Sequence, residues 1–226
     1  MKIVLKIGGF AFSTEGRKEP LICDYVKLLK RLAGKHRFVV VTGGGAIARL
    51  YIRIARNMQV PESLCDQLGI FVTRLNARLV ADGLSDRAYP EIPSTVAELN
   101  RFFASGKVVA MGGLQPGHST NAVAAIAAET VKANLFLNAT DVNGVYTSDP
   151  GKNSRAEQLD EVTVCKLEEI LFKNEMSAGG YDLMDHIALK ILQRSHIPTV
   201  IFDGRDLSNV KRALRGEKIG TRILTD

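Results

Sequence analysis

Three glycine clusters in this chain each separate an apolar, β-branched run from a helical pattern. The clusters lie at residues 8–9, 43–45 and 112–113. Such a junction exposes the unpaired backbone N–H groups of a helix N-terminus, which hold an anionic oxygen without any side chain. One such end contributes about 0.3–1 kcal/mol per charge at a surface. Several junctions converging on one cleft, aided by lysine and arginine, would suit a polyphosphate.

These clusters do not match the two common phosphate-binding fingerprints. Residues 43–45 are not followed by Lys-Ser or Lys-Thr at the P-loop spacing, and neither 43–45 nor 112–113 fits G-x-G-x-x-G. A Walker or Rossmann site is therefore excluded. Taken singly, each cluster is equally consistent with a tight turn and close packing.

Two polar segments accompany the glycines. Residues 115–120 read Gln-Pro-Gly-His-Ser-Thr and lead into a small-residue helix, which Ser119 or Thr120 is suited to cap unless it contacts a phosphate. His118 has no carboxylate partner that the sequence identifies, which favours a structural role. Residues 138–150 predict a strand end, an Asn-Gly turn and a short extended piece, for which a plain hairpin is the alternative to a ligand site.

The elements that must position these segments alternate along the chain. Strands are predicted near residues 2–8, 37–43, 107–112, 134–140 and 198–202. Helices are predicted near residues 22–33, 45–57, 62–83, 95–104, 119–131, 184–196 and 206–214. This order is typical of an α/β domain with parallel strands and crossover helices. The polar stretch 151–180 is expected to be a mobile excursion, either a lid or a long surface loop, within a single domain of residues 1–226.

Composition and charge narrow the class of protein. The 226 residues are 46% hydrophobic, as in an ordinary globular protein. The net charge of +6 comes from scattered residues rather than a basic run, which argues against nucleic-acid binding and suits a nucleotide substrate. Cys23, Cys65 and Cys165 form no disulfide or zinc pattern, and no apolar stretch approaches about 18 residues. A cytoplasmic protein without a membrane anchor is expected.

The motifs, in their order and spacing, resemble those of the amino acid kinase superfamily. The matching residues are Lys6-Ile7-Gly8-Gly9, Thr42-Gly43-Gly44-Gly45 with Arg49, Gly112-Gly113 with Pro116-Gly117-His118-Ser119-Thr120, and Thr140-Asp141-Val142-Asn143-Gly144-Val145-Tyr146 with Asp149-Pro150. Within the superfamily, the chain is similar to the archaeal type of uridylate (UMP) kinase. That similarity rests on its length, on residues 116–120, and on Asp66, Gly69-Ile70 and Thr73-Arg74-Leu75-Asn76-Ala77.

The resemblance implies a fold and a reaction. The fold is an α/β three-layer α/β/α sandwich with a mainly parallel eight-stranded central sheet. The reaction is phosphoryl transfer from ATP to UMP, giving ADP and UDP, with Mg²⁺ carried by the nucleotide and no metal ligand predicted in the protein. Members of the family are generally homohexamers. A cleft across the carboxyl ends of the strands also agrees with the general rule for open α/β sheets.

The resemblance also implies roles for residues of this chain. The residues implied to act in catalysis are Lys6, Arg49 and Asp185. The implied ATP site consists of Lys6, Gly8, Gly9, Phe10, Gly45, Arg49, Thr140, Asp141, Tyr146 and Asp149. The implied UMP site consists of Gly44, Asp66, Leu114, Gln115, Pro116, Gly117, His118, Ser119 and Thr120.

Two residues depart from the family pattern. Phe10 stands where many relatives have serine or glycine, and Asn121 where many have aspartate. For Asp185, the alternative role is to stabilise a helix N-terminus. Two other functions stay open: an acyl-phosphate-forming relative such as an acetylglutamate or carbamate kinase, and a nucleotide-binding regulatory or storage protein without turnover.

Overall fold

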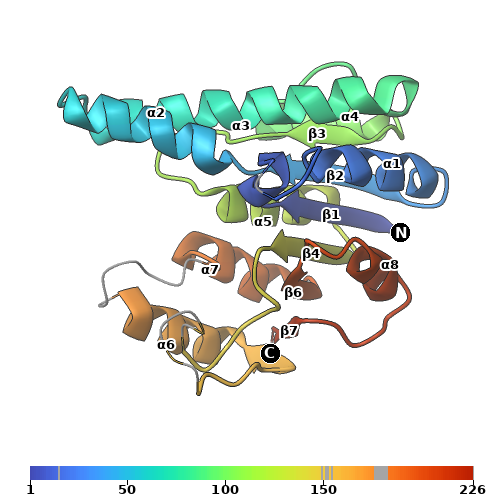
Figure 1. Ribbon diagram of the computed structural model, residues 1–226. Helices are drawn as coiled ribbons and strands as arrows, with labels where there is room; N and C mark the ends of the chain where they lie inside the picture. The colour runs from blue at the N-terminus through green and yellow to red at the C-terminus, as the bar shows by residue number, and fades with distance from the viewer. Residues whose placement is uncertain (15, 149, 151–152, 154, 176–182, 226) are drawn as a thin grey trace.

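A central sheet lies between two layers of helices in the computed structural model (Figure 1). The structure describes residues 1–226 except 15, 149, 151–152, 154, 176–182 and 226. At 172–175 it describes the backbone alone. The strands are β1 (Lys2–Ile7), β2 (Arg37–Thr42), β3 (Val109–Met111), β4 (Leu135–Thr140), β5 (Glu161–Thr163), β6 (Thr199–Asp203) and β7 (Thr221–Leu224). The helices are α1 (Ile22–Leu32), α2 (Gly45–Asn57), α3 (Glu62–Leu84), α4 (Val96–Ala104), α5 (Thr120–Val131), α6 (Val164–Glu175), α7 (His186–Ser195) and α8 (Ser208–Leu214). Two short 3₁₀ helices are η1 (Gly9–Phe12) and η2 (Ser85–Arg87).

The seven described strands form one sheet in the order β3-β2-β1-β4-β6-β7-β5. Neighbouring strands are parallel except β6 and β7, which are antiparallel. The apolar runs of β1, β2 and β4 are buried almost throughout, as strands covered on both faces require. Because β1, β2 and β3 are parallel neighbours, the glycine junctions that follow them meet at one edge of the sheet.

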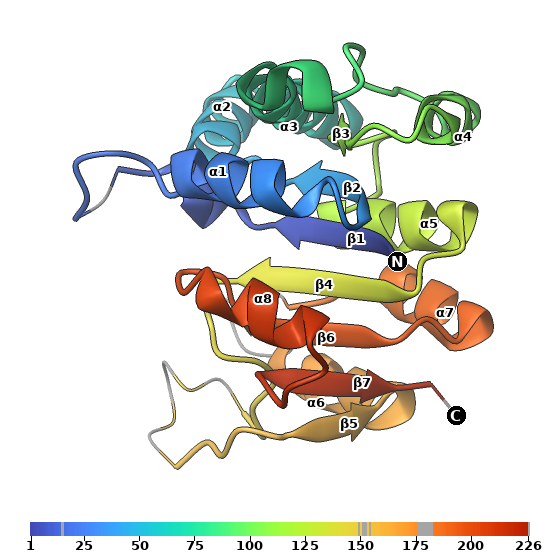
Figure 2. The same ribbon diagram turned by 90° about the vertical axis from the view of Figure 1, so that its right-hand side faces the viewer.

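Side chains that alternate along each strand build a core on each face of the sheet. Val4 and Phe136 face a cluster with α4, α5, α6 and α7. Leu5 and Phe202 face the opposite cluster with α1, α3 and α8. Figure 2 shows α1 and α8 in front of the sheet and α5 and α7 behind it. Among the described residues, no helix is both long and apolar enough to cross a membrane.

The predicted α/β alternation is confirmed, and each predicted strand and helix is found within two residues of its expected ends. Two strands and one α-helix were missed, besides the two short 3₁₀ helices. β5 is three residues long and buries only Val162, and β7 follows a charged segment. α6 shows a helical spacing in Val164, Leu167 and Ile170, but its lysines and glutamates obscured it. Residues 161–175 are therefore regular structure rather than the expected excursion, and the sheet has seven described strands where eight were implied.

Candidate active site

The junctions after β1 and β2 touch each other backbone to backbone. Gly45 has a φ of +63°, and a Cβ built on Gly9 would lie 2.1 Å from the Gly45 Cα. A Cβ on Gly43 would lie 2.8 Å from the Gly9 nitrogen. No side chain fits between these loops, so positions 9 and 43 both need glycine. The two junctions form one unit at the carboxyl edge of the sheet, where ligands bind in open α/β folds.

A pocket of about 260 Å³ opens beside this unit. Its lining residues are Lys6, Gly8, Gly9, Phe10, Ser13, Ala46, Arg49, Thr140, Asp141 and Leu183. Seven of these ten were predicted for the ATP site; Ser13, Ala46 and Leu183 were not. β1 brings Lys6, α2 brings Arg49, and the segment after β4 brings Asp141. Two cations and one carboxylate therefore converge from three separate elements on one pocket.

Lys6 is the most enclosed charged group of this pocket, with 9% of its surface exposed. Its strand lies between β2 and β4, and Val41 and Asn138 are its register partners on either side. Pairing on both edges fixes the Lys6 backbone. A cation with so little contact with water attracts an anion more strongly than an exposed one, because less solvent screens its charge.

Phe10 packs on the glycines rather than replacing their contacts. A Cβ on Gly8 would lie 2.8 Å from the Phe10 ring, and a Cβ on Gly204 would lie 2.8 Å from its Cζ. The Gly8 N–H donates to the Ala139 carbonyl at 3.0 Å. The N–H groups of Gly9 and Phe10 begin η1, where a helix has no internal acceptor for them. Phe10 therefore braces the loop with its ring and leaves contacts with a ligand to the backbone.

Residues 114–120 follow β3 and are held by hydrogen bonds to side chains; we call them the acceptor loop after the role that the resemblance implies for them. The Asp66 Oδ2 accepts from the Gly117 N–H at 2.9 Å. The side chains of Gln115 and His118 are 3.2 Å apart, between Nε2 atoms. Ser119 is the N-cap of α5, and its hydroxyl accepts from the N–H groups of Asn121 and Ala122. Its predicted capping role is confirmed.

Asp185 contacts the acceptor loop from the start of α7. It is the N-cap of α7, where its Oδ1 accepts from the Ala188 N–H at 3.0 Å. Its Oδ2 accepts from the Ser119 hydroxyl, which joins the caps of α5 and α7. The helix-capping alternative describes this geometry, while the carboxylate in the pocket of Lys6 and Arg49 belongs to Asp141. A catalytic role for Asp185 stays a prediction.

The segment after β4 bends at residues 141–144, where Gly144 has a φ of +105°, but these residues are not assigned as the predicted tight Asn-Gly turn. Thr140 Oγ1 donates to the Val142 carbonyl at 2.9 Å and accepts its N–H at 3.2 Å. Tyr146 then pairs with Gln158 in an antiparallel bridge, which confirms the extended piece. Tyr146 is outside the described lining of the pocket, and Asp149 is outside the described residues.

Asn121 replaces a family aspartate and uses its amide in a way that a carboxylate cannot. Its Nδ2 donates to the Leu183 carbonyl at 3.1 Å, and its Oδ1 accepts from the Asn138 amide at 3.3 Å. Asn138 also donates to the Leu183 carbonyl, at 3.3 Å. An ionised carboxylate has no donor for this carbonyl. The neutral pair therefore ties β4 and α5 to the backbone just before α7.

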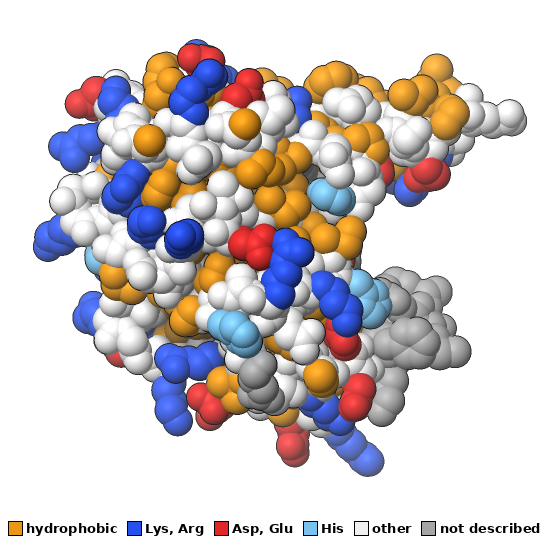
Figure 3. Space-filling model, turned by 180° about the vertical axis from the view of Figure 1, so that it is seen from behind, with side chains coloured by type: hydrophobic (Ala, Val, Ile, Leu, Met, Phe, Trp, Pro, Cys, Tyr) orange, Lys and Arg blue, Asp and Glu red, His pale blue; other side chains and the backbone are white. Residues whose placement is uncertain are grey.

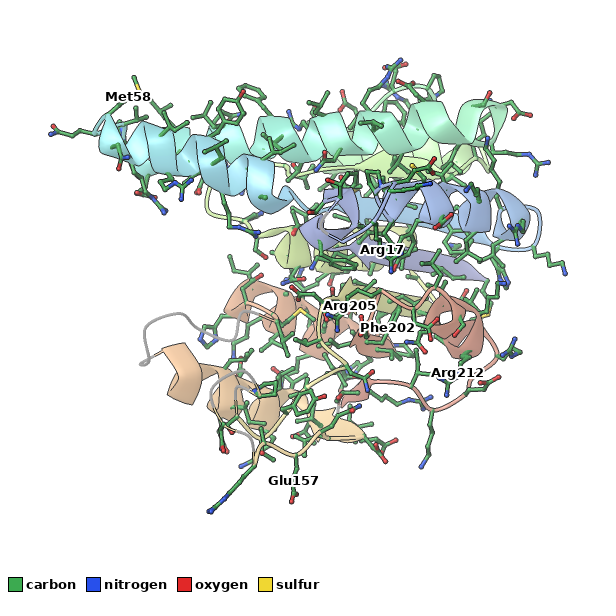
Figure 4. The ribbon with its side chains drawn as sticks, in the orientation of Figure 1. Arg17, Met58, Glu157, Phe202, Arg205 and Arg212 are labelled. Atoms are coloured by element: carbon green, nitrogen blue, oxygen red, sulfur yellow. The ribbon has the colours of Figure 1, made fainter. Side chains whose placement is uncertain are left out.

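The sequence did not predict the roles of two groups beside the site, the Asp203 carboxyl and the Tyr25 hydroxyl. Partial burial opposes ionisation of Asp203, yet the hydrogen bonds from Arg205 hold the pKa of this carboxyl below its usual value. Figure 4 shows Arg205 just beyond β6. The Tyr25 hydroxyl donates to the Gly204 carbonyl at 2.7 Å; burial raises its pKa, with further effects from the charges of Asp203 and Asp206. These contacts fix the turn after β6, and no sequence motif marks them.

The comparisons with known proteins cover the whole chain. The model of the amino acid kinase family matches residues 1–203. Uridylate kinase of Methanothermobacter thermautotrophicus is 44% identical over 226 residues, which is 100% of both chains. Uridylate kinase of Sulfolobus acidocaldarius is 42% identical over 97% of this chain and 96% of its own.

Solved structures give the same answer. The crystal structure of uridylate kinase from Archaeoglobus fulgidus has a TM-score of 0.87 and 38% identity, covering 99% of this chain and 100% of its own. The UMP kinase structure from Ureaplasma parvum, at 22% identity and a TM-score of 0.80, supports the fold alone and covers 99% of this chain and 98% of its own. The motifs and the sheet of this chain, together with these matches, assign it to the amino acid kinase family.

Proposed function

We propose that this chain is a uridylate kinase, which transfers the γ-phosphoryl group of ATP to UMP and gives ADP and UDP. The observation that carries the proposal is the convergence of Lys6 and Arg49 on a pocket beside the locked glycine junctions. The acceptor loop follows the next strand along, and the relatives named uridylate kinase match the full length of the chain.

In this proposal, catalysis consists of positioning and charge. Two anionic phosphates must approach in line, so Lys6, Arg49 and backbone N–H groups offset their repulsion and stabilise the charge of the transition state. The acceptor oxygen of UMP is already ionised near neutral pH, so the protein needs no general base. The backbone at Gly8 and Gly9 holds the group in transit, with the Gly9 N–H as the donor because the Gly8 N–H already donates to the Ala139 carbonyl. Gly45 lies on the ATP side.

The remaining residues divide between the two nucleotides. Thr140, Asp141, Tyr146 and Asp149 contact adenosine. Gly44, Asp66 and the acceptor loop bind UMP. Asp66 uses Oδ2 for the loop, and within the described part of the chain its Oδ1 makes no hydrogen bond, so it is placed to accept from a ribose hydroxyl.

Mg²⁺ fits this pocket when it arrives with ATP. It favours oxygen ligands and is usually held by one or two carboxylates together with substrate phosphates. Asp141 supplies such a carboxylate in the pocket, whereas no group of three acidic, histidine or cysteine side chains gathers elsewhere in the described residues. The ion, carried by the nucleotide, would neutralise phosphate charge, and Asp141 is the carboxylate that the described lining of the pocket offers to it.

The outer side of α2 and α3 supports a homohexamer. Tyr51, Met58, Phe71, Leu75 and Leu79 are each more than half exposed. Figure 3 shows hydrophobic side chains along the projecting end of these helices, and Figure 4 shows Met58 at its tip. Apolar area of this extent is typical of protein–protein contact. Light scattering should give six subunits for the wild type and fewer for Leu75→Glu, with Val96→Glu on α4 as the control; six subunits in both variants would contradict this face.

The compartment is proposed to be the cytoplasm, because the three cysteines are free thiols, as in a reducing environment. The reaction itself is tested by ADP release from purified protein with ATP and Mg²⁺. The acceptor panel consists of UMP, CMP, AMP, N-acetylglutamate and carbamate. UMP should stimulate ADP release above every other acceptor. Greater stimulation by an acyl acceptor, or none by any acceptor, would overturn the proposal in favour of the two alternatives.

A further inference from the structure

Helix α3 holds two of the glycine junctions through its inward side. The Thr42 hydroxyl donates to the Thr73 carbonyl at 2.8 Å, and the Asn76 amide donates to the Gly43 carbonyl at 2.8 Å. A Cβ on Gly112 would lie 2.5 Å from the Arg74 nitrogen, so the third junction lies directly on the helix backbone. α3 is thus the common support for the strand ends of β2 and β3.

Arg74 makes the most specific of these contacts. Its Nε donates to the Gly113 carbonyl at 2.9 Å, and its Nη2 donates to the Leu114 carbonyl at 3.0 Å. The neighbouring Thr73 hydroxyl accepts from the Gly113 N–H at 2.8 Å and donates to the Ile70 carbonyl at 2.7 Å. One planar guanidinium therefore orients two successive peptide groups at the start of the acceptor loop.

The same orientation determines the direction of the N–H groups on the opposite side of the loop. In a trans peptide the N–H points away from the C=O. The carbonyls of Gly113 and Leu114 face Arg74, so the N–H groups of Leu114 and Gln115 face away from it. Neither N–H donates to an acceptor within the described part of the chain. Two aligned donors are thereby left for an oxygen atom of a ligand.

We infer that Arg74 is a positioning residue for the nucleotide acceptor: by fixing the peptides of Gly113 and Leu114, it presents the next two N–H groups to an oxygen of UMP. This inference deepens the proposed function and rests on it. Arg74 does not itself need to touch UMP. Its loss leaves the Lys6 and Arg49 pocket intact, so the effect belongs to the acceptor and not to ATP.

The test compares Arg74→Met with Arg78→Met one helical turn later. Arg78 pairs with Asp82 at the surface, so its variant removes the same charge without touching the loop. Arg74→Met should raise the KM for UMP about 10-fold, which corresponds to one lost hydrogen bond from a charged donor, and change the KM for ATP less than twofold. Arg78→Met should match the wild type. A merely structural loss would lower kcat by reducing the active fraction and would leave both KM values unchanged.

Three further variants test the role of Arg74 and its neighbour if Arg74→Met folds poorly. Arg74→Lys keeps the charge but not the planar fork, so it should recover only part of the affinity for UMP. Thr73→Ser keeps the hydroxyl and should retain the wild-type KM for UMP, whereas Thr73→Val should raise it. Full recovery in Arg74→Lys, or equal rises in the two KM values, would overturn the inference. A wild type that does not phosphorylate UMP would instead overturn the proposed function.

Discussion

The two sides of the candidate site are built differently. On the donor side, Gly9 and Gly45 meet with no room for a side chain, and the neighbouring charges come from β1 and α2. On the acceptor side, the loop after β3 is held by hydrogen bonds to Asp66, Arg74 and Asp185. Backbone contact makes the donor side intolerant of substitution. Because separate side-chain hydrogen bonds hold the acceptor side, a substitution there should remove one contact and leave the others in place.

The substitution with the largest expected effect on the donor side is Gly9→Ala. The new Cβ would lie 2.1 Å from the Gly45 Cα, so the loops that follow β1 and β2 must move apart. We expect a loss of about 3 kcal/mol or more in the free energy of unfolding, measured by urea titration, together with loss of activity. Gly34→Ala is the control, because nothing lies within 4 Å of its added Cβ. Equal stability of the two variants would show that the junctions do not interlock.

Removing the charges of the donor side should affect the rate more than the fold. Lys6→Met and Arg49→Ala should each lower kcat about 100-fold, as expected for loss of one preorganised group that stabilises transition-state charge. Circular dichroism should show a retained fold. Lys30→Met, on the exposed side of α1, serves as the control. Wild-type turnover in either donor-side variant would refute the role of that residue.

On the acceptor side, Asn121→Asp should cost stability. The carboxylate cannot donate to the Leu183 carbonyl, and among the described residues Asn138 is then the one donor that this acceptor keeps. We expect a loss of about 1–3 kcal/mol in the free energy of unfolding near neutral pH. Asn121→Ser retains a donor and should lose less. A more stable Asn121→Asp protein would mean that a cation, rather than this carbonyl, dominates the position.

The smallest effect is expected beside the donor pocket, at Asp203. Its lowered pKa means that the contact with Arg205 stabilises the fold above the ordinary pKa of the carboxyl, and that this contribution is lost as the pH falls through the folded-state value. Because Arg205 is largely exposed, the contribution should stay below about 1 kcal/mol. Unfolding of Asp203→Asn and wild type is compared at pH 7 and pH 3. A wild-type advantage at pH 3 but not at pH 7 would contradict the sign.

The sequence predicted the parts that depend on local pattern. Apolar runs and helical spacing located β1, β2, β4 and the helix starting at Gly45, and the rule for open α/β sheets agreed with a cleft at the carboxyl ends of the strands. The sequence did not predict how the glycine junctions meet there. The contact of Gly9 with Gly45 and the reach of Arg74 to the acceptor loop depend on the lengths of crossovers and on packing between distant segments.

Asp185 illustrates the same limit at the level of one residue. The sequence offered two roles for it, near the cations or at a helix N-terminus. Only the packing of α7 against α5 brings its carboxylate to the Ser119 hydroxyl. Local pattern therefore identified the residue as significant, while the tertiary arrangement decided its neighbours.

The glycine contact between the first two junctions also bears on the entropy of binding. A side chain that binds a phosphate loses rotamer freedom, and this loss of entropy weakens the affinity. Backbone donors around Gly9 and Gly45 have no rotamers to lose, and the interlock has already fixed their dihedral angles during folding. In the proposed kinase, the conformational cost of binding the phosphate at these donors would thus arise once, when the chain folds, rather than in every catalytic cycle.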